Sequence, residues 1–229
     1  VSIIIPVLNN WQLTNDALNS ILSLTDYPNY EIIIVDNASS DDTPNKLKEF
    51  EQEYSDKLKN IRLSKNYGFS AANNTGVDAA AGELLLFLNN DIIVLKKNWL
   101  TVMVDTLSMH PDIAATGQMP VMDFNTNNGL HYIQTIFLPY LHIPVNWISG
   151  YCLLVKRDVF FEAGKWRDDL YGLAGYEDIH LGYAINKIGK YCVSSDRWID
   201  IKHLISRTQK DPNIQNAINA VSAEQKIKN

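Results

Sequence analysis

Apolar runs and amphipathic stretches alternate along the first half of the chain. Runs such as 31–35 and 84–88 lack polar alternation, which is typical of strands buried on both faces of a parallel sheet. The stretches between these runs carry apolar residues at helical spacing. The pattern predicts strands at 1–7, 31–35, 61–64, 84–88 and 113–117, and helices at 11–24, 42–54, 70–81 and 99–109. This alternation predicts right-handed βαβ units and an α/β fold with a mainly parallel, twisted sheet flanked by helices.

The pattern is looser in the second half of the chain. Residues 118–146 combine Pro, Asn and aromatic side chains without a clear period, which predicts a loop-rich region over the sheet. Polar residues at 211–229 predict a surface helix. Between these two regions we expect a strand at 147–155, a helix from about 158, a helix at 178–188 with Gly189 as its C-cap, and a strand at 198–201.

Composition narrows the classes of function. The 229 residues suit one α/β domain, and a net charge of −6 argues against a nucleic-acid partner, which needs a basic face. Cys152 and Cys192 lie in apolar surroundings, so we expect reduced core thiols in a cytoplasmic protein. No signal peptide is visible and no apolar run approaches a membrane span. Because Val1 is not Met and already belongs to a strand, we expect one domain of a larger protein.

The apolar run 84–88 ends abruptly in two amides and a carboxylate. Asn89, Asn90 and Asp91 follow it directly, where open α/β sheets bind ligands beyond the carboxyl ends of their strands. A carboxylate at this place suits a Mg²⁺ or Mn²⁺ ion that also binds a substrate phosphate. The sequence therefore predicts an enzyme that handles nucleotides.

Asp36 leaves the buried strand 31–35 in a similar way. Its carboxylate is placed to accept a hydrogen bond from the N3–H group of a uracil or thymine ring. The alternative is that residues 36–43 only form a turn and cap the next helix, a role that suits Ser39, Ser40 and Asp41. We favour ligand binding for Asp36 because of its position at the end of a strand.

Three further motifs allow both a functional and a structural interpretation. Gly68 lets the backbone approach a ligand at a helix start, or it belongs to a simple turn. Glu177 and Asp178 open a helix, where acidic side chains are favourable even without a catalytic role. His203 follows a predicted strand, and a lone His is more often structural than a ligand.

Together these motifs resemble one family. The segments VSIIIPVLN (1–9), VDNASSD (35–41), NYGFSAANNTG (66–76) and LNND (88–91) are similar to the nucleotide-binding half of inverting family 2 glycosyltransferases of the GT-A fold. In the second half, WISGYCLLVKR (147–157), AGKW (163–166) and YEDIHL (176–181) agree with the same family. The resemblance spans residues 1–207 and implies one GT-A-type domain. It comprises a nucleotide-sugar-binding half at 1–117, an acceptor-binding and catalytic half at 118–207, and a C-terminal surface helix or tail at 208–229.

The resemblance also implies a role for each matching residue. Asp178 would be the catalytic base, and Asp91 and His203 would bind a Mn²⁺ or Mg²⁺ cofactor. The nucleotide pocket would comprise Pro6, Val7, Asn9, Asp36, Asn66, Gly68, Phe69, Asn73, Asn89 and Asn90. The acceptor groove would be lined by Trp147, Gly150, Tyr176 and Glu177, with helix capping as the alternative for Glu177.

Three departures from the family pattern stand out. Asn89 replaces the first acidic residue of the Asp-X-Asp motif, which removes one charge from the metal site. Asn73 stands where relatives often carry an Arg that meets the diphosphate. Residues 165–168 (KWRD) replace a more usual Gly-Phe-Asp-Glu, and we assign them no role.

The implied reaction transfers a sugar from a UDP or dTDP donor to an acceptor hydroxyl with inversion, although GDP donors occur among relatives. The acceptor would be a carbohydrate or a lipid-linked glycan in bacterial polysaccharide, cell-wall or glycoconjugate assembly. An acceptor carried on a lipid would place this cytoplasmic domain at the inner membrane surface. A nucleotidyltransferase is disfavoured, because the loop 6–11 has neither a Gly nor a cation to bind a triphosphate. A degenerate carbohydrate- or nucleotide-binding domain of the same fold remains the alternative.

Overall fold

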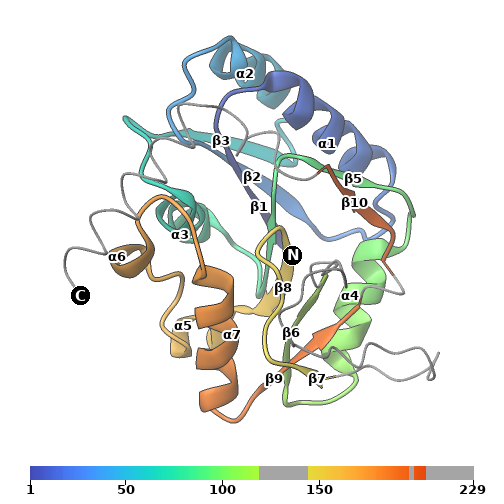
Figure 1. Cartoon of the computed structure of the whole chain (residues 1–229). Coiled ribbons are helices and arrows are strands. Elements are labelled where there is room, and N and C mark those ends of the chain that lie inside the picture. Colours follow the sequence, from blue (N-terminus) through green and yellow to red (C-terminus); the bar gives the residue numbers. More distant parts are fainter. Residues whose placement is uncertain (119–143, 196–198, 205–229) are drawn as a thin grey trace, which may run out of the picture.

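The computed structural model describes residues 1–118, 144–195 and 199–204, which form a mixed, mostly parallel sheet between helices (Figure 1). The large sheet has the order β3-β2-β1-β4-β8-β6-β9-β7, and β5 and β10 form a separate antiparallel pair. The strands are β1 (Ser2–Val7), β2 (Glu31–Asp36), β3 (Leu58–Arg62), β4 (Leu84–Leu88), β5 (Ile92–Val94), β6 (Ile113–Gly117), β7 (Pro144–Val145), β8 (Cys152–Lys156), β9 (Tyr191–Ser194) and β10 (Ile201–His203).

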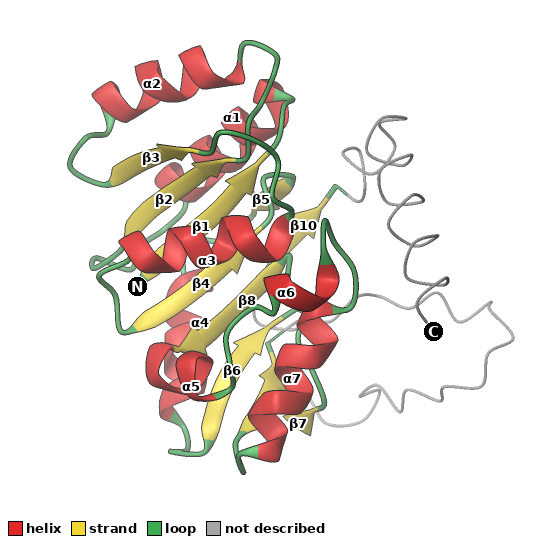
Figure 2. Cartoon of the chain, turned by 90° about the vertical axis from the view of Figure 1, so that its left-hand side faces the viewer, coloured by secondary structure: helices red, strands yellow, loops and turns green. Residues whose placement is uncertain are grey.

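Helices cover both faces of this sheet, which confirms the predicted fold class. In Figure 2, α3, α5, α6 and α7 lie in front of the sheet, whereas α1 and α4 lie behind it. The helices are α1 (Trp11–Ser23), α2 (Thr43–Glu53), α3 (Phe69–Ala79), α4 (Trp99–Ser108), α5 (Arg157–Glu162), α6 (Asp168–Tyr171) and α7 (Glu177–Lys187).

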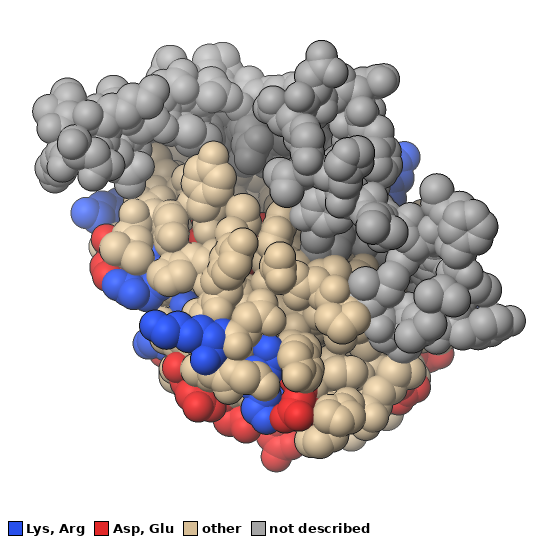
Figure 3. Space-filling model, turned by 60° about the horizontal axis from the view of Figure 1, so that its bottom comes forward, with Lys and Arg blue, Asp and Glu red and all other residues tan. Residues whose placement is uncertain are grey.

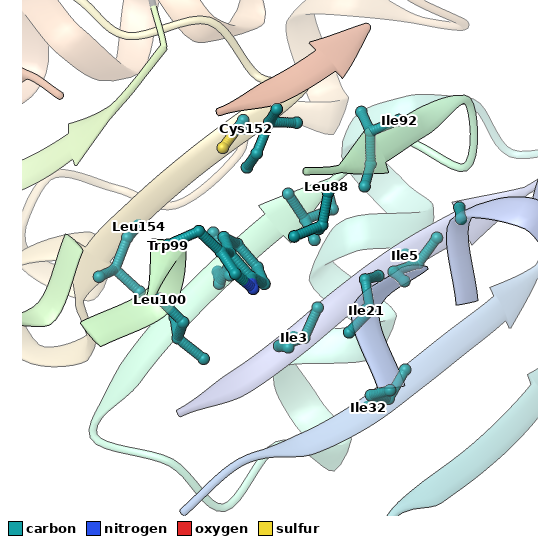
Figure 4. Close-up of a cluster of buried hydrophobic side chains, with 14 of the residues drawn as sticks. Ile3, Ile5, Ile21, Ile32, Leu88, Ile92, Trp99, Leu100, Cys152 and Leu154 are labelled. Atoms are coloured by element: carbon teal, nitrogen blue, oxygen red, sulfur yellow. The ribbon is translucent and has the colours of Figure 1, made fainter. Parts of the chain in front are cut away.

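The alternation of side chains along each strand divides the core into two layers. Ile3 and Ile5 of β1 belong to the layer that contains α1 and α4, whereas Ile4 belongs to the layer that contains α3. Figure 4 shows the first layer, in which Ile21 of α1 and Trp99 of α4 pack over the central strands. Because both faces are covered, the strands are apolar without alternation, as the sequence predicts.

Several predicted boundaries in the sheet are wrong. β3 begins at Leu58, three residues before the predicted 61–64, because this edge strand buries little of its surface and its apolar signal is weak. β8 begins at Cys152, after a turn in which Cys152 N–H donates to the Ser149 carbonyl at 3.1 Å, and it runs antiparallel to β4. β10 contains His203, which we expected after a strand. Short strands β5 and β9 were not predicted, since three or four residues carry too little pattern.

Some predictions fall on residues that the structure does not describe. These are the loop-rich region apart from residues 118 and 144–146, the start of the predicted strand 198–201, and the C-terminal helix at 211–229. The division into a nucleotide half, an acceptor half and a tail therefore stays a prediction. The expected C-cap is present, because Gly189 follows α7 with a φ of 77°.

The two cysteines lie in the interior, and one face of the surface carries charges of both signs (Figure 3). Cys152 and Cys192 are buried and form no disulfide, and burial raises the pKa of the Cys192 thiol to about 12. On the face shown in Figure 3, basic and acidic side chains lie near one another among uncharged ones. Within the described residues, every helix is too short or too polar to cross a membrane.

Candidate active site

The carboxyl ends of the parallel strands meet at one edge of the sheet. In the registers of β1, β2 and β3, Val7 lies opposite Asp36, which lies opposite Arg62. On the other side of β1, Leu88 at the end of β4 pairs with Cys152 at the start of antiparallel β8. The loops that carry the predicted site residues therefore leave the sheet side by side, as the rule for open α/β sheets requires.

Asp36 is fully buried at this edge, with an exposed fraction of 0%. Its Oδ1 accepts the Ser39 N–H at 2.8 Å, and its Oδ2 forms an ion pair with the Arg62 guanidinium. Arg62 also donates to the Ser39 carbonyl at 2.9 Å. Both carboxylate oxygens thus have protein partners, and base binding by Asp36 itself stays a prediction.

The loop after β1 is fastened to the turn after β2. Asn9 N–H donates to Ser39 Oγ and Asn9 Oδ1 accepts the Ser40 N–H, each at 2.7 Å. Asn10 N–H donates to Asp41 Oδ2 at 2.7 Å. Asn9 and Asn10 have φ values of 58° and 60°, a left-handed conformation that Asn tolerates better than most residues. Asn9 therefore links the two loops through its backbone N–H and its side chain.

Asn37 connects the end of β2 to the loop before α3. Its Nδ2 donates to Asn66 Oδ1 at 2.8 Å and to the Gly68 carbonyl at 3.3 Å, and its Oδ1 accepts the Tyr67 N–H at 2.9 Å. Asn66 Oδ1 also accepts the Gly68 N–H at 2.9 Å. The predicted pocket residue Asn66 is thus part of a side-chain network that fixes the backbone of this loop.

Gly68 has a role that the sequence did not reveal. We expected either a close approach of its backbone to a ligand or a simple turn, and in the structure its backbone lies close to protein, whereas contact with a ligand stays a prediction. A Cβ at Gly68, where φ is 89°, would lie 2.2 Å from the Gly172 carbonyl oxygen. Phe69 N–H donates to the Leu173 carbonyl at 2.9 Å. Gly68 therefore joins the nucleotide-side loop to the segment that precedes α7.

The remaining predicted nucleotide residues are mostly covered. Val7 is almost completely buried, and Pro6 lies beyond the part of β1 that pairs with β4, so its missing N–H removes no bond to that strand. Asn73 is fully buried in α3 and donates to the Phe69 carbonyl at 3.0 Å. Its Oδ1 has no partner among the described residues. Their contact with a nucleotide stays a prediction.

Asp91 and His203 face each other beside β5 and β10. The exposed fraction of Asp91 is 4%, and its Oδ1 lies 3.1 Å from His203 Nε2 without forming a hydrogen bond. Asn89 Nδ2 lies 3.4 Å from the same ring nitrogen. Asn90 instead donates to Thr14 of α1 at 3.0 Å, so its side chain anchors a helix in this structure.

This pair fits a small divalent cation. An unpartnered, buried carboxylate oxygen and a ring nitrogen are ligands for Mn²⁺ or Mg²⁺, and adjacent ligands of such an octahedral ion lie roughly 3 Å apart. No group of three or more His, Cys, Asp or Glu side chains with metal-binding geometry occurs within 1–118, 144–195 and 199–204. An octahedral ion that is held by Asp91 and His203 has further coordination positions, which phosphate oxygens can fill.

Asp178 lies in the first turn of α7 and is held by several donors. Its Oδ2 accepts the Gly150 N–H at 3.1 Å, and its Oδ1 accepts the Ile179 N–H at 2.8 Å. The Ser149 hydroxyl bonds to the same carboxylate. Burial raises the pKa of Asp178 above its ordinary value, although these hydrogen bonds oppose the shift. The result is a fixed carboxylate of increased basicity.

Of the predicted acceptor residues, Gly150 contacts this carboxylate directly, and the others lie on or beside α7. Burial raises the pKa of Glu177, whose Oε2 accepts the Gly175 N–H, so this residue supports the start of α7. Tyr176 has a φ of 65° and is 75% exposed. Trp147 packs against α7, because a Cβ at Gly182 would lie 2.4 Å from the Trp147 Cβ. Contact of these residues with an acceptor stays a prediction.

One short segment before β8 connects the pair Asp91 and His203 to Asp178. Gly150 donates to Asp178, and the Tyr151 ring stacks on His203 with centroids 4.2 Å apart. The Tyr151 carbonyl accepts the Asn89 N–H at 3.1 Å. The turn 149–151 therefore contacts Asp178, His203 and the start of the Asn-Asn-Asp motif.

Sequence reasoning missed Arg62, Asn37 and Ser149. Arg62 was missed because the boundary of β3 was predicted wrongly. The strand ends at Arg62, opposite Asp36, whereas the predicted strand 61–64 puts this residue near its start. Asn37 sits within the quoted motif, but an amide after a strand resembles an ordinary turn residue. The hydroxyl of Ser149 could be linked to Asp178 only through the tertiary structure.

The chain belongs to glycosyl transferase family 2, whose model matches residues 2–162. This confirms the resemblance. The O-antigen biosynthesis protein RfbC of Myxococcus xanthus is 29% identical over 209 residues, which cover 82% of this chain and 16% of that protein. The chain thus spans less than a fifth of that relative.

Solved structures share the fold. The mannosyltransferase PcManGT of Pyrobaculum calidifontis, in complex with GDP-Man and Mn²⁺, matches with a TM-score of 0.66 and 20% identity, over 84% of this chain and 53% of that one. GalNAc-T7 with UDP, GalNAc and Mn²⁺ matches with a TM-score of 0.71 and 18% identity, over 88% of this chain and 42% of that one.

Proposed function

We propose that this chain is the catalytic domain of an inverting glycosyltransferase that moves a sugar from a nucleotide diphosphate to an acceptor hydroxyl. The bond between the anomeric carbon and the diphosphate breaks as the acceptor oxygen bonds to the opposite face of that carbon. Asp178 takes the proton of the acceptor hydroxyl. Inversion needs no covalent intermediate, so one base is sufficient, and the transition state resembles that of glycoside hydrolysis.

The turn 149–151 is the observation that carries this proposal. It holds a desolvated carboxylate, Asp178, at the same edge of the sheet as the pair Asp91 and His203. A general base needs a raised pKa and a fixed orientation, and the buried, hydrogen-bonded Asp178 has both. A domain that only bound ligands would have no use for a carboxylate of increased basicity.

The metal is part of the proposal. Asp91 and His203 would hold a Mn²⁺ or Mg²⁺ ion, which supplies positive charge to the departing diphosphate when bound. Asn89, which replaces an acidic residue, lies beside His203 and contributes a neutral amide.

The donor and acceptor are proposed as classes. The donor is a UDP- or dTDP-sugar, and the acceptor is a carbohydrate or a lipid-linked glycan of polysaccharide or glycoconjugate assembly. The similarity to an O-antigen biosynthesis protein supports this acceptor class. An acceptor on a lipid would bring the domain to the inner membrane surface from the cytoplasm.

Calorimetric titration with UDP, dTDP and GDP, each with and without Mn²⁺, tests the proposal. We expect metal-dependent binding of a nucleotide, followed by slow hydrolysis of the matching sugar nucleotide without an acceptor. Binding without any hydrolysis or transfer would favour a degenerate binding domain of the same fold. A chain that binds no nucleotide would contradict both.

A further inference from the structure

Two large aromatic side chains of α7 are exposed to solvent. Tyr176 is the N-cap of this helix and is 75% exposed, and Tyr183 is 57% exposed. Residues at i and i+7 lie on the same side of a helix, so the two tyrosines follow one side of α7 about 10 Å apart. The buried residues of α7 are Leu181, Gly182 and Ile185. The tyrosines therefore belong to the outer side of α7, which does not pack on the sheet.

A third tyrosine extends this outer side toward α6. In Figure 2, α6 lies beside the first turns of α7, in front of the sheet. The ring of Tyr171 in α6 meets the ring of His180 in α7 edge-on, with centroids 5.6 Å apart. His180 lies one turn after Tyr176, whose carbonyl accepts the His180 N–H at 3.0 Å. We call this group of rings the α7 aromatic strip; it comprises Tyr171, Tyr176, His180 and Tyr183.

The α7 aromatic strip begins at the proposed active site. Tyr176 lies two residues before Asp178, in the same helix start. The Asp178 carboxylate accepts the Gly150 N–H and so faces the turn 149–151, whereas the strip leads away along the outer side of the helix. A glycan whose reacting hydroxyl meets Asp178 would therefore continue past Tyr176 onto the strip.

The composition of the strip suits uncharged sugar rings. The outward positions of α7 at helical spacing are Tyr176, Ile179, His180 and Tyr183, and none of them is Lys, Arg, Asp or Glu. A sugar ring has apolar C–H faces, which stack on an aromatic face, and hydroxyls at its rim, which bond to polar groups such as the Tyr O–H. An anionic lipid surface would instead require Lys or Arg at these positions.

We propose that the α7 aromatic strip binds the sugar units of the acceptor glycan that lie beyond the unit at Asp178. The strip thereby selects oligosaccharide acceptors over monosaccharides. This inference rests on the proposed function, since it concerns the acceptor of the same reaction. It goes beyond that function because Tyr171, His180 and Tyr183 lie outside the predicted acceptor groove.

The test compares acceptor fragments of increasing length. Oligomers of glucose, galactose, mannose and N-acetylglucosamine, each from the monosaccharide to the hexasaccharide, are titrated by nuclear magnetic resonance with Mn²⁺ and the nucleotide that calorimetry identifies. We expect at least one series in which affinity rises with length by about 3–10-fold for each stacked ring, the size of one aromatic contact. Tyr183→Ala should remove most of this gain and leave binding of the monosaccharide and the nucleotide unchanged. Tyr183→Phe retains the ring face and should retain most of the gain.

Tyr191→Ala is the matched control, because Tyr191 is 47% exposed but lies at the start of β9, at the sheet edge opposite the site. It should leave every affinity unchanged. Affinities that do not depend on length in any series, or a gain that survives Tyr183→Ala, would overturn the proposal. A dimer that forms without glycan and is lost in Tyr183→Ala, measured by sedimentation, would also overturn it, because the strip would then join two copies of the chain.

The nucleotide titrations separate this inference from the function on which it rests. A chain that binds its nucleotide with Mn²⁺ and hydrolyses the sugar nucleotide, but shows no dependence on glycan length, would refute the strip alone. A chain that binds no nucleotide would refute the proposed function and the inference with it.

Discussion

The two parts of the site differ in how completely protein atoms satisfy their polar groups. On the nucleotide side, Asp36, Asn37 and Asn66 each bond to protein through their side chains. On the proposed catalytic side, Asp91 Oδ1 is buried and has no hydrogen-bond partner among the described residues, and burial raises the pKa of both Glu177 and Asp178. The first region is thus largely hydrogen-bonded to protein, apart from Asn73 Oδ1, which has no partner among the described residues, whereas the second contains a buried oxygen of Asp91 and two desolvated carboxyl groups.

This difference separates residues that fix the shape of the site from residues that we propose to take part in the reaction. A hydrogen-bond network that is complete without a ligand fixes the loops before the donor binds. Its disruption should therefore lower the stability of the fold more than it lowers activity. Unsatisfied or desolvated groups lower stability and persist where function needs them. Replacing a residue on the catalytic side should therefore change activity strongly and stability little, and the reverse should hold for the nucleotide side.

The largest effect is expected for Asp178→Asn. Loss of the general base should lower turnover about 10²–10⁴-fold while binding of the nucleotide diphosphate persists, because the amide keeps the shape of the carboxylate. Turnover and calorimetry together measure this. Asp158→Asn is the matched control, because Asp158 also accepts the N–H of the next residue at a helix start, at 2.8 Å. Equal losses of binding and turnover at position 178 would contradict the role of a base.

The same variant checks the sign of the pKa shift. Because the pKa of Asp178 is raised in the folded chain, the folded state binds more protons than the unfolded state between the ordinary and the raised value. Its contribution to stability is therefore fully present below the ordinary pKa and is lost as the pH rises through the raised one. Melting curves at a series of pH values should show this loss in the unmodified chain, and Asp178→Asn should reduce it.

The next largest effect concerns the contact between the two regions at Gly68. In Gly68→Ala the new Cβ would lie 2.2 Å from the Gly172 carbonyl oxygen at a φ of 89°. Gly164→Ala is the control, since Gly164 has a φ of 93° and no atom within 4 Å of an added Cβ. We expect the control to lose about 1–2 kcal/mol from backbone strain alone. Gly68→Ala should lose about 3 kcal/mol, which lowers the melting temperature by roughly 6–12 °C. Equal melting temperatures for the two variants would show that the contact is not tight in solution.

The sequence predicts most of the fold but only part of the site. The central strands are identified by completely apolar runs, because helices cover both of their faces. Asp91 is singled out because a carboxylate directly follows such a run, and Asp178 because its motif resembles that of the family; the roles of both stay predictions. The cover of Asp36 by Arg62 and the contact of Gly68 with Gly172 depend on which strands and loops are neighbours, and local patterns do not contain that information.

A smaller effect is expected for Asp91→Ala. Removal of the unpartnered carboxylate should weaken the Mn²⁺-dependent part of nucleotide binding more than about 10-fold and leave the metal-independent part unchanged. Titration of Mn²⁺ into the nucleotide-bound chain measures this directly. Asp200→Ala is the control, since Asp200 is half exposed and contacts only Lys96 at 3.9 Å among the ion pairs of the described residues. Mn²⁺ dependence that survives Asp91→Ala would place the metal elsewhere.

The smallest effect is expected for Ser149→Ala. The Ser149 hydroxyl stabilises the ionised form of Asp178, so its removal should raise the pKa of this carboxyl further. The acidic limb of the profile of kcat/KM against pH should move to higher pH, with a few-fold loss of activity on that limb and none on the alkaline plateau, where Asp178 is fully ionised. Ser108→Ala is the control, because its hydroxyl donates to the Val104 carbonyl on the exposed side of α4. A uniform loss at all pH values would indicate that Ser149 only supports the turn 149–151, whereas a shifted limb would show that it tunes the base.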